Sequence, residues 1–420
     1  MSSAHADLQD PQPGGTVGWL PTAVLCAPIV AVTLLAKLSV PPFAVQGIDM
    51  SLLVIFTVIG AGLFAGCMRL DSWRLALYAL AVGSLGFVQL LRPDAYSVSS
   101  LALLAAIHLP YVFAVEHSAD DVNRATSFFL RIATLLAWCG IAQYFLQFFV
   151  DPRWLFPIEN FVPGSYVVQH FNSQGVLNYG SDVYRANGVF LLEPSFFSQL
   201  LGVAVVVELC TQSRLSRLAT YGLALLVSSA GTGLLILAVC VPLFVVQRRR
   251  WDLLLVGAAG LAIVSVFRDS FFLSHLLARS GEFSSIRSSG YARFVGGFYL
   301  FDQFLWDDPW RTLFGFGVGS FRDYVARAHY PVAEMALFKV VFEFGLVGSL
   351  VYFGFLVYCL ATSSAPRLVT IAVGIAYLLN GIYVPFAHGL ALGLLIWNSA
   401  PENYIARPFM SALVPSSVEI

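Results

Sequence analysis

The sequence predicts an all-α integral membrane protein with about twelve membrane elements, within a range of roughly ten to twelve. Three observations predict this fold class. Of the 420 residues, 58% are hydrophobic and 11% are charged, whereas roughly a quarter of the residues in a soluble domain carry charge. The mean hydropathy is +0.78. Apolar runs near the length needed to cross a bilayer, about 20 residues, recur along the chain.

Most of the apolar runs fit single membrane-spanning helices. These runs are 19–40, 48–67, 75–91, 98–115, 127–150, 188–208, 251–267, 334–360 and 367–387. Residues 218–247 are too long for one straight span and are interrupted by Ser228-Ser229-Ala230-Gly231-Thr232-Gly233. They predict a hairpin of two short helices, 218–229 and 233–247. The short run 389–400 follows Pro385 and His388 and predicts a re-entrant or final short helix.

Basic residues in the short connections predict the orientation, because they alternate onto one side of the membrane. They are Arg69, Arg74, Arg124, Arg214, Arg217, Arg248, Arg249, Arg250 and Arg367. This side is expected to be cytoplasmic. Residues 19–400 then form one polytopic domain between a disordered cytoplasmic tail, 1–18, and a second cytoplasmic tail, 401–420. The two large loops, 151–187 and 268–333, are expected on the opposite side.

Arg is concentrated in and just before the second large loop. The residues are Arg268, Arg279, Arg287, Arg293, Arg311, Arg322 and Arg327. Because the planar Arg fork binds phosphate oxygens in pairs, we expect an anionic, phosphorylated, lipid-linked substrate at the membrane surface. For Arg293, which opens an aromatic helix, substrate contact is favoured. For Arg279, Arg311 and Arg322, pairing with carboxylates of the same loop is an equal alternative.

The first large loop ends in Arg185-Ala186-Asn187-Gly188, and Glu193-Pro194-Ser195 follow. If 188–208 is helical, Glu193 lies roughly 8 Å below the start of the helix. Its carboxylate would sit among the free N–H groups of the first turns, which favour anions. An ionisable residue in a span marks a functional site by default. The alternative is that Glu193 only pairs with Arg185 and fixes the loop.

Three further features precede or open the span 334–360. Gly315, Gly317 and Gly319 lack the βαβ context of a dinucleotide site, so they predict a tight turn packed against a ligand or a helix. Lys339 and Glu343 share a helix face and can neutralise each other. His329 is either a general base or a surface residue. No disulfide framework is expected, because all six Cys lie in or at the edge of apolar segments.

The order of these features resembles the Wzy-type polysaccharide polymerases and O-antigen ligases, bacterial inner-membrane glycosyltransferases of the GT-C kind. The resemblance covers roughly residues 130–360 and rests on Arg185 to Gly188 with Glu193-Pro194-Ser195, the break at 228–233, Arg293 before the glycine turn, and Lys339 to Gly348. The chain looks closer to exopolysaccharide polymerases, such as those of the xanthan type, than to the ligases. Two positions depart from the family pattern: Ala230-Gly231 replace a frequent Arg, and Glu334-Met335 replace a frequent His-Asn pair, whose role falls to His329.

The resemblance implies that the substrate is an oligosaccharide repeat unit on undecaprenyl diphosphate, presented at the periplasmic face. Arg185, Arg287 and Arg293 would bind the diphosphate and stabilise the charge that grows on it as the sugar leaves. His329, Glu193 or Glu334 would accept the proton of the attacking hydroxyl. Lys339, Glu343 and the three glycines would support the site.

We expect no metal and no cofactor, since no cluster with ligand spacing occurs in the loops. The expected partners are the lipid-linked glycan, the bilayer, a chain-length-regulating co-polymerase and a flippase, and no nucleic acid. Two alternatives stay open: a ligase that moves glycan to another acceptor, and a transporter without chemistry. A transporter would place its charges along a central path, whereas the charges here cluster at one face.

Overall fold

We describe the protein from a computed structural model, which places residues 18–41, 49–90, 97–177, 181–251, 285–286 and 288–399. The span expected at 251–267 and Arg268, Arg279 and Arg287 lie outside these residues, as do nearly all of the two predicted tails. The described chain is mostly helical, as predicted. Its one sheet pairs two short strands, β1 (Met68–Leu70) and β2 (Phe113–Val115), in antiparallel register with Arg69 opposite Ala114.

Four helices in the described part are long and apolar enough to cross a membrane. They are α3 (Ser72–Leu90), α5 (Ala119–Leu146), α10 (Gly231–Arg248) and α17 (Ala336–Ala361). Shorter apolar helices accompany them: α1 (Leu20–Leu34), α2 (Ser51–Phe64), α4 (Val98–His108) with the 3-10 turn η3 (Leu109–Val112), α8 (Pro194–Cys210), α9 (Leu215–Ser228), α18 (Arg367–Leu379), and α19 (Pro385–Ala391) with the π-helical turn η6 (Leu392–Ile396).

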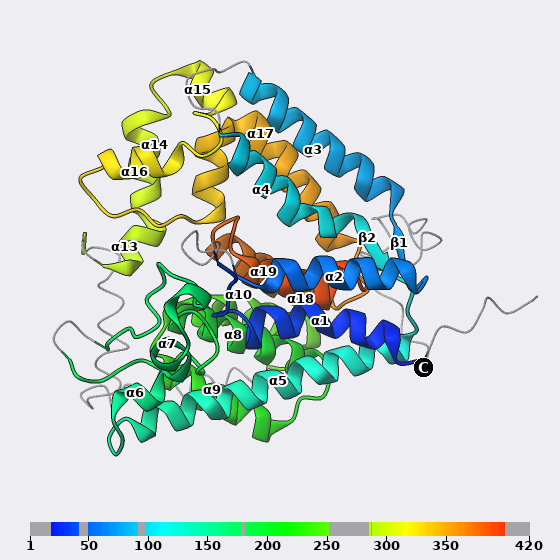
Figure 1. Ribbon diagram of the computed structural model, residues 1–420, viewed down its shortest axis with the longest axis vertical. Helices are drawn as coiled ribbons and strands as arrows, with labels where there is room; N and C mark the ends of the chain where they lie inside the picture. The colour runs from blue at the N-terminus through cyan, green and yellow to red at the C-terminus, as the bar shows by residue number, and fades with distance from the viewer. Residues whose placement is uncertain are drawn as a thin grey trace, which may run out of the picture.

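Short helices gather at one end of the bundle, and the two strands lie at the other (Figure 1). The short helices are α6 (Pro152–Leu155), α7 (Pro157–Phe161), the turn η4 (Gly164–Tyr166), α13 (Ser289–Phe294), α14 (Gly296–Phe304), α15 (Pro309–Phe314) and α16 (Phe321–Arg327). These elements belong to the two predicted large loops. Near the strands, the buried Arg74 donates to the carbonyl of Ile396 over 2.8 Å and to the Thr362 hydroxyl over 2.8 Å.

The hairpin predicted at 218–247 is present. α9 ends at Ser228, Ser229 adopts a left-handed conformation with φ 45°, and α10 begins at Gly231. The break packs on the first turn of α8, where Ser198 donates to the carbonyl of Ala230 over 2.8 Å. The second predicted helix, 233–247, is present as α10, which is slightly longer and runs for 18 residues through Pro242 to Arg248.

Several helix boundaries differ from the apolar runs, since hydropathy does not mark polar helix ends. α5 begins at Ala119 rather than 127, because Ser118 and Asp121 form a capping box. The last helix begins at Pro385, a residue type suited to a first helical turn, rather than at 389. Most of the described helices pack around one large apolar cluster. A second cluster, which includes Leu300, Phe316 and Phe342, lies between the short helices and α17.

Candidate functional site

Glu193 occupies the N-cap position of α8, without a side-chain capping hydrogen bond, and does not lie inside the helix. Gly188 and Val189 both have φ 69°, so the segment before Pro194 cannot continue as helix, and the predicted start at 188 is wrong. The expected depth of Glu193 below the helix start therefore does not hold. The carboxylate accepts the backbone N–H of Asn172 at 3.0 Å on Oε1 and the hydroxyl of Ser195 at 3.1 Å on Oε2. It is partly exposed at the surface end of α8.

Arg293 approaches this carboxylate from the second large loop. Its Nη2 lies 3.8 Å from Oε2 of Glu193, and the two side chains are 25% and 22% exposed. Arg293 lies in the short helix α13, which Ser288 caps by accepting the N–H of Tyr291 at 3.0 Å. The second large loop therefore meets the segment between the first large loop and α8 at an ion pair that remains open to solvent.

Arg185 borders the same site. Its Nε donates to the carbonyl of Val176 over 2.9 Å. A Cβ built on Gly175 would lie 3.4 Å from Nη2 of Arg185 and 3.6 Å from the side-chain nitrogen of Asn172. The backbone N–H of Asn172 also binds Glu193. The 172–176 turn therefore contacts Arg185 directly and contacts the Glu193–Arg293 pair through Glu193. Of the three predicted diphosphate ligands, Arg185 contacts the 172–176 turn, Arg293 pairs with the Glu193 carboxylate that the same turn binds, and Arg287 lies outside the described residues.

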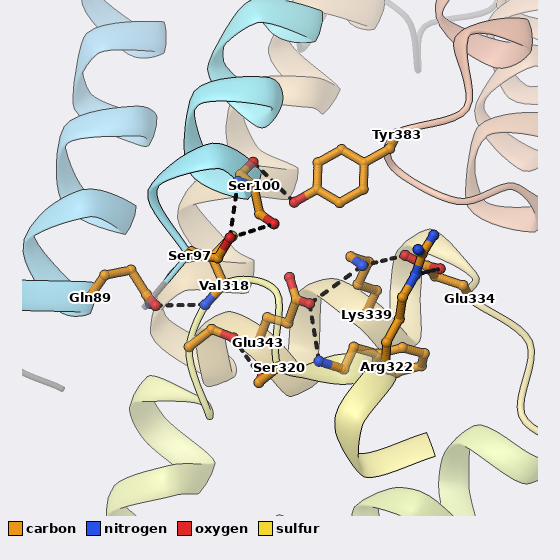
Figure 2. A network of polar contacts seen from close by, with 12 residues as sticks. Gln89, Ser97, Ser100, Val318, Ser320, Arg322, Glu334, Lys339, Glu343 and Tyr383 are labelled. Carbon is orange, nitrogen blue, oxygen red and sulfur yellow. Dashed lines mark hydrogen bonds and ion pairs between the residues drawn. The ribbon is translucent and has the colours of Figure 1, made fainter. Parts of the chain in front are cut away.

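A second charged group lies at the start of α17 (Figure 2). Glu334 pairs with Nζ of the buried Lys339 and, over 3.1 Å, with Nε of the exposed Arg322. Lys339 is also 3.4 Å from Oε1 of Glu343, a carboxylate with no exposed surface. The predicted Lys339–Glu343 pair thus exists within a chain of alternating charges. The ring of Tyr383 lies 4.8 Å from Nζ of Lys339 and covers it from the 380–384 connection.

The predicted glycine turn packs against a helix and not against an open cleft. α17 is kinked at Gly345, whose φ is 65°, and Gly317 donates its N–H to the carbonyl of Glu343 over 2.9 Å. A Cβ on Gly315 would lie 2.3 Å from that same carbonyl oxygen. On the other side, a Cβ on Gly319 would lie 2.9 Å from Cβ of Ser97. The turn therefore locks the kink and holds the buried Glu343 in place.

The two charged groups are joined through the backbone. Ala333, just before Glu334, donates its N–H to the carbonyl of Ala292, just before Arg293, over 2.8 Å. Asn380 accepts the N–H of Ala336 at 2.7 Å and donates to Gln199 of α8 over 2.7 Å. These contacts thus connect the N-terminal parts of α8 and α17 and the segment of α13 that carries Arg293. Neither Asn380 nor Gln199 carried a signal in the sequence, because both act through contacts between distant segments.

Burial alone would raise the pKa of Glu334. The positive charges of Lys339 and Arg322 outweigh burial, so the pKa of Glu334 lies below its usual value. A carboxylate held by two cations is a poor proton acceptor. The geometry therefore favours a supporting role for Glu334. His329 is exposed between α16 and α17 and makes no hydrogen bond or ion pair with any residue that the structure places. Its imidazole is accessible to a substrate.

Arg311 and Arg322 pair with carboxylates, which was one of the two alternatives that the sequence left open for them. Arg311 lies 3.2 Å from Asp308 in its own short helix and stacks over Phe316, with 4.5 Å from its guanidinium carbon to the ring centroid. Arg322 pairs with Glu334 while most of its side chain stays exposed. Arg279 lies outside the described residues.

Sequence reasoning missed a buried ion pair that supports the first large loop. Nζ of Lys37 lies 2.6 Å from Oε1 of Glu159 in α7 and also donates to the carbonyl of Val189. Lys37 thereby ties the end of α1 to the segment that leads into Glu193. The available signal was composition, because Lys37 and Lys339 are the two Lys of the chain and each is buried against a Glu.

No family model matches the sequence, and a search of curated proteins finds no match.

Proposed function

We propose that this protein is a bacterial inner-membrane glycosyltransferase that polymerises undecaprenyl-diphosphate-linked oligosaccharide repeats at the periplasmic face. In this proposal it has about twelve membrane elements in a GT-C-like arrangement. The observation that carries the proposal is the Glu193–Arg293 pair at the start of α8, with Arg185 beside the same turn. It supports the family resemblance through geometry, because the two arginines that the motifs single out are linked through the same 172–176 turn, Arg185 directly and Arg293 through Glu193.

Arg293 and Arg185 are suited to bind a diphosphate. Arg293 lies beside the N-cap residue of α8, and the positive end of the α8 dipole adds a favourable field for an anion. Before substrate binds, the Glu193 carboxylate positions the Arg293 guanidinium. Because both side chains are partly exposed, the guanidinium stays available to a phosphate. On substrate binding, the phosphate oxygens would compete with Glu193 for the Arg293 donors.

The same groups are suited to the chemical step. When the acceptor hydroxyl attacks the anomeric carbon, the bond from that carbon to the diphosphate oxygen breaks, and the electron pair leaves with the diphosphate. Fixed Arg donors stabilise this charge more in the transition state than in the ground state. The proton of the acceptor hydroxyl goes to a base, for which His329 and Glu193 are the accessible groups.

In this proposal the charged group around Lys339 supports the site through the backbone contact between Ala333 and Ala292. The start of α17 is fixed by the ion pairs among Lys339, Glu334 and Glu343. The hydrogen bond from Ala333 to Ala292 then holds the segment that carries Arg293 against this fixed start. In this proposal Lys339 and Glu343 keep the supporting role assigned to them from the sequence, together with Gly315, Gly317 and Gly319.

The decisive experiment supplies purified protein with a synthetic lipid-linked repeat unit, with EDTA in one arm and Mg²⁺ in the other. A ladder of products in both arms supports a metal-independent polymerase. A single transfer to an added foreign acceptor would make the protein a ligase. Movement of the lipid-linked sugar across vesicle membranes without any new glycosidic bond would make it a transporter, and would end the proposal of catalysis.

The two accessible bases are separated by matched variants in the same assay. Glu193→Gln retains an oxygen that can accept the bond from Asn172, and His329→Gln retains a polar side chain of similar length. Loss of a general base costs about 10²–10⁴-fold in turnover with little change in substrate binding. The variant that shows this loss identifies the base. If neither does, both residues lose that role.

A further inference from the structure

A groove lies between three helices at the end of the bundle opposite the candidate site. α1 runs between α2 and α5 (Figure 1). The groove has a volume of about 590 Å³ and is lined by Trp19, Thr22, Ala23, Cys26, Ala27 and Val30 of α1 and its cap, Val54 of α2, and Arg124 and Phe128 of α5. Its volume falls within the range of pockets that hold small-molecule ligands.

The walls of the groove are almost entirely apolar. Ala23 and Ala27 lie one helical turn apart on α1, and their small side chains leave the space that larger residues would fill. Phe128 and Val54 close the sides. In a chain with helices fit to cross a membrane, an apolar groove along a helix accommodates an acyl chain by shape and by the lack of polar partners.

One end of the groove differs, because a cation and an indole lie there. Arg124 is exposed in the second turn of α5, and no carboxylate among the described residues forms an ion pair with it. The nearby Asp121 accepts the Thr22 hydroxyl at 2.6 Å and the Ser118 hydroxyl at 2.6 Å, and it attracts Arg124 electrostatically without forming an ion pair with it. Trp19 is 64% exposed beside it. An exposed Trp next to an Arg is the usual composition of a helix end at the membrane–water boundary.

A second Arg follows on the same face of α5. Arg131 is seven residues after Arg124, two helical turns further, and is exposed. Arg131 does not line the groove, so the cationic end of the groove is made by Arg124.

We propose that this groove binds one anionic phospholipid, with the headgroup phosphate on Arg124 and an acyl chain along Ala23, Ala27 and Phe128. The charge distribution favours this occupant over a neutral lipid, because the groove has a cationic end and apolar walls. Basic pockets between membrane helices are typical binding sites for anionic headgroups. The site is separate from the proposed glycosyl transfer, which is assigned to the other end of the bundle.

The test is native mass spectrometry of the full-length protein, with phosphatidylglycerol and phosphatidylcholine added in equal amounts. We expect the wild type to retain phosphatidylglycerol over phosphatidylcholine by about fivefold or more. Arg124→Gln should bring this ratio close to one. Ala27→Leu fills the groove and should reduce retention of both lipids. Arg367→Gln removes an exposed Arg at the start of α18, outside the groove, and should keep the wild-type ratio.

Thermal melting of each variant shows whether it is folded, and Ala23→Leu replaces Ala27→Leu if the latter is not. Equal retention of the two lipids by the wild type would overturn the proposal. So would an unchanged lipid ratio in Arg124→Gln. If Ala27→Leu instead abolishes a dimer and leaves lipid retention unchanged, the groove is an interface between two copies of the chain, and the lipid proposal is wrong.

Discussion

Arg293 belongs to the second large loop and Glu193 to the segment just after the first, yet Nη2 of the Arg293 guanidinium lies 3.8 Å from Oε2 of the Glu193 carboxylate. The pair sits at the first turn of α8, and both side chains keep about a quarter of their surface exposed, 25% and 22%. A pair in this position contributes little to stability, since solvent screens it. Its arrangement is better explained by function, because a partly exposed, positioned Arg can exchange its carboxylate partner for a phosphate.

Replacing Arg293 with Ala should abolish polymer while protein level and melting temperature stay close to wild type. The reason is that an Arg aimed at a leaving diphosphate contributes in the transition state, where one such donor is worth about 10²–10³-fold. Arg293→Lys should restore little, because a point charge lacks the two-pronged donor geometry. The measurement is the rate of chain extension from a synthetic lipid-linked repeat.

Arg311→Ala is the matched control, because Arg311 lies in the same loop but pairs with Asp308 in its own helix. It should extend chains at close to the wild-type rate. A normal product ladder in Arg293→Ala would remove Arg293 from the mechanism, and an equal loss in both variants would mean that the loop charge as a whole matters.

Glu334→Gln should destabilise the folded protein at neutral pH by roughly 1–3 kcal/mol, because the buried Lys339 loses one of its carboxylate partners. Since the folded-state pKa of Glu334 is below its usual value, the ionised carboxylate stabilises the fold at pH values above the unfolded-state pKa. This contribution is lost as pH falls through the folded-state pKa. The difference in melting temperature between wild type and variant should therefore be large at pH 7 and shrink under acid conditions.

The same melting curves contain the control. Arg322→Gln removes only the exposed partner of Glu334, so its effect should stay below about 1 kcal/mol at every pH. A Glu334→Gln difference that is independent of pH would show that the carboxylate charge does not stabilise Lys339.

Local features of the site could be predicted from the sequence. The features that could not be predicted depend on backbone conformation or on contacts between distant segments. The break at 228–233, the close packing of the glycine turn and the Lys339–Glu343 pair follow from local patterns, so they could be predicted. The position of Glu193 at the cap of α8 depends on left-handed backbone at Gly188 and Val189, which hydropathy does not reveal. The partners Asn172, Asn380 and Glu159 act across large sequence separations. Such contacts leave no periodic or spacing signal in a single sequence.

Gly315→Ala should destabilise the protein severely, by about 3 kcal/mol or more, since it combines a left-handed φ with a steric clash. The φ of Gly315 is 74°, and an added Cβ would lie 2.3 Å from the carbonyl oxygen of Glu343. A shift of the backbone at Gly315 or at Glu343 would relieve the clash, but either shift would open the kink at Gly345. Chemical unfolding in detergent, followed by circular dichroism, measures the loss.

Gly354→Ala provides the comparison within α17, because a Cβ there meets nothing within 4 Å. It should be neutral or stabilise the helix by about 0.5–1 kcal/mol. Equal effects of the two substitutions would mean that the turn does not lock the kink.

The last prediction concerns Lys37 and Glu159, whose charges are buried 2.6 Å apart with exposed side-chain fractions of 1% and 12%. Removing one charge leaves the other buried without its partner, so Lys37→Met should cost about 3–5 kcal/mol. Removing both, in Lys37→Met with Glu159→Leu, should restore most of that stability, because apolar side chains of similar volume avoid the desolvation of both ions. Melting of the two single variants and the double variant completes a thermodynamic cycle. A double variant as unstable as the sum of the two single variants would contradict a direct pair.

If the double variant melts like the wild type but extends chains more slowly, the pair positions the segment from Val189 to Glu193 for catalysis. That result is expected, because Lys37 also donates to the carbonyl of Val189 and Met cannot replace this bond.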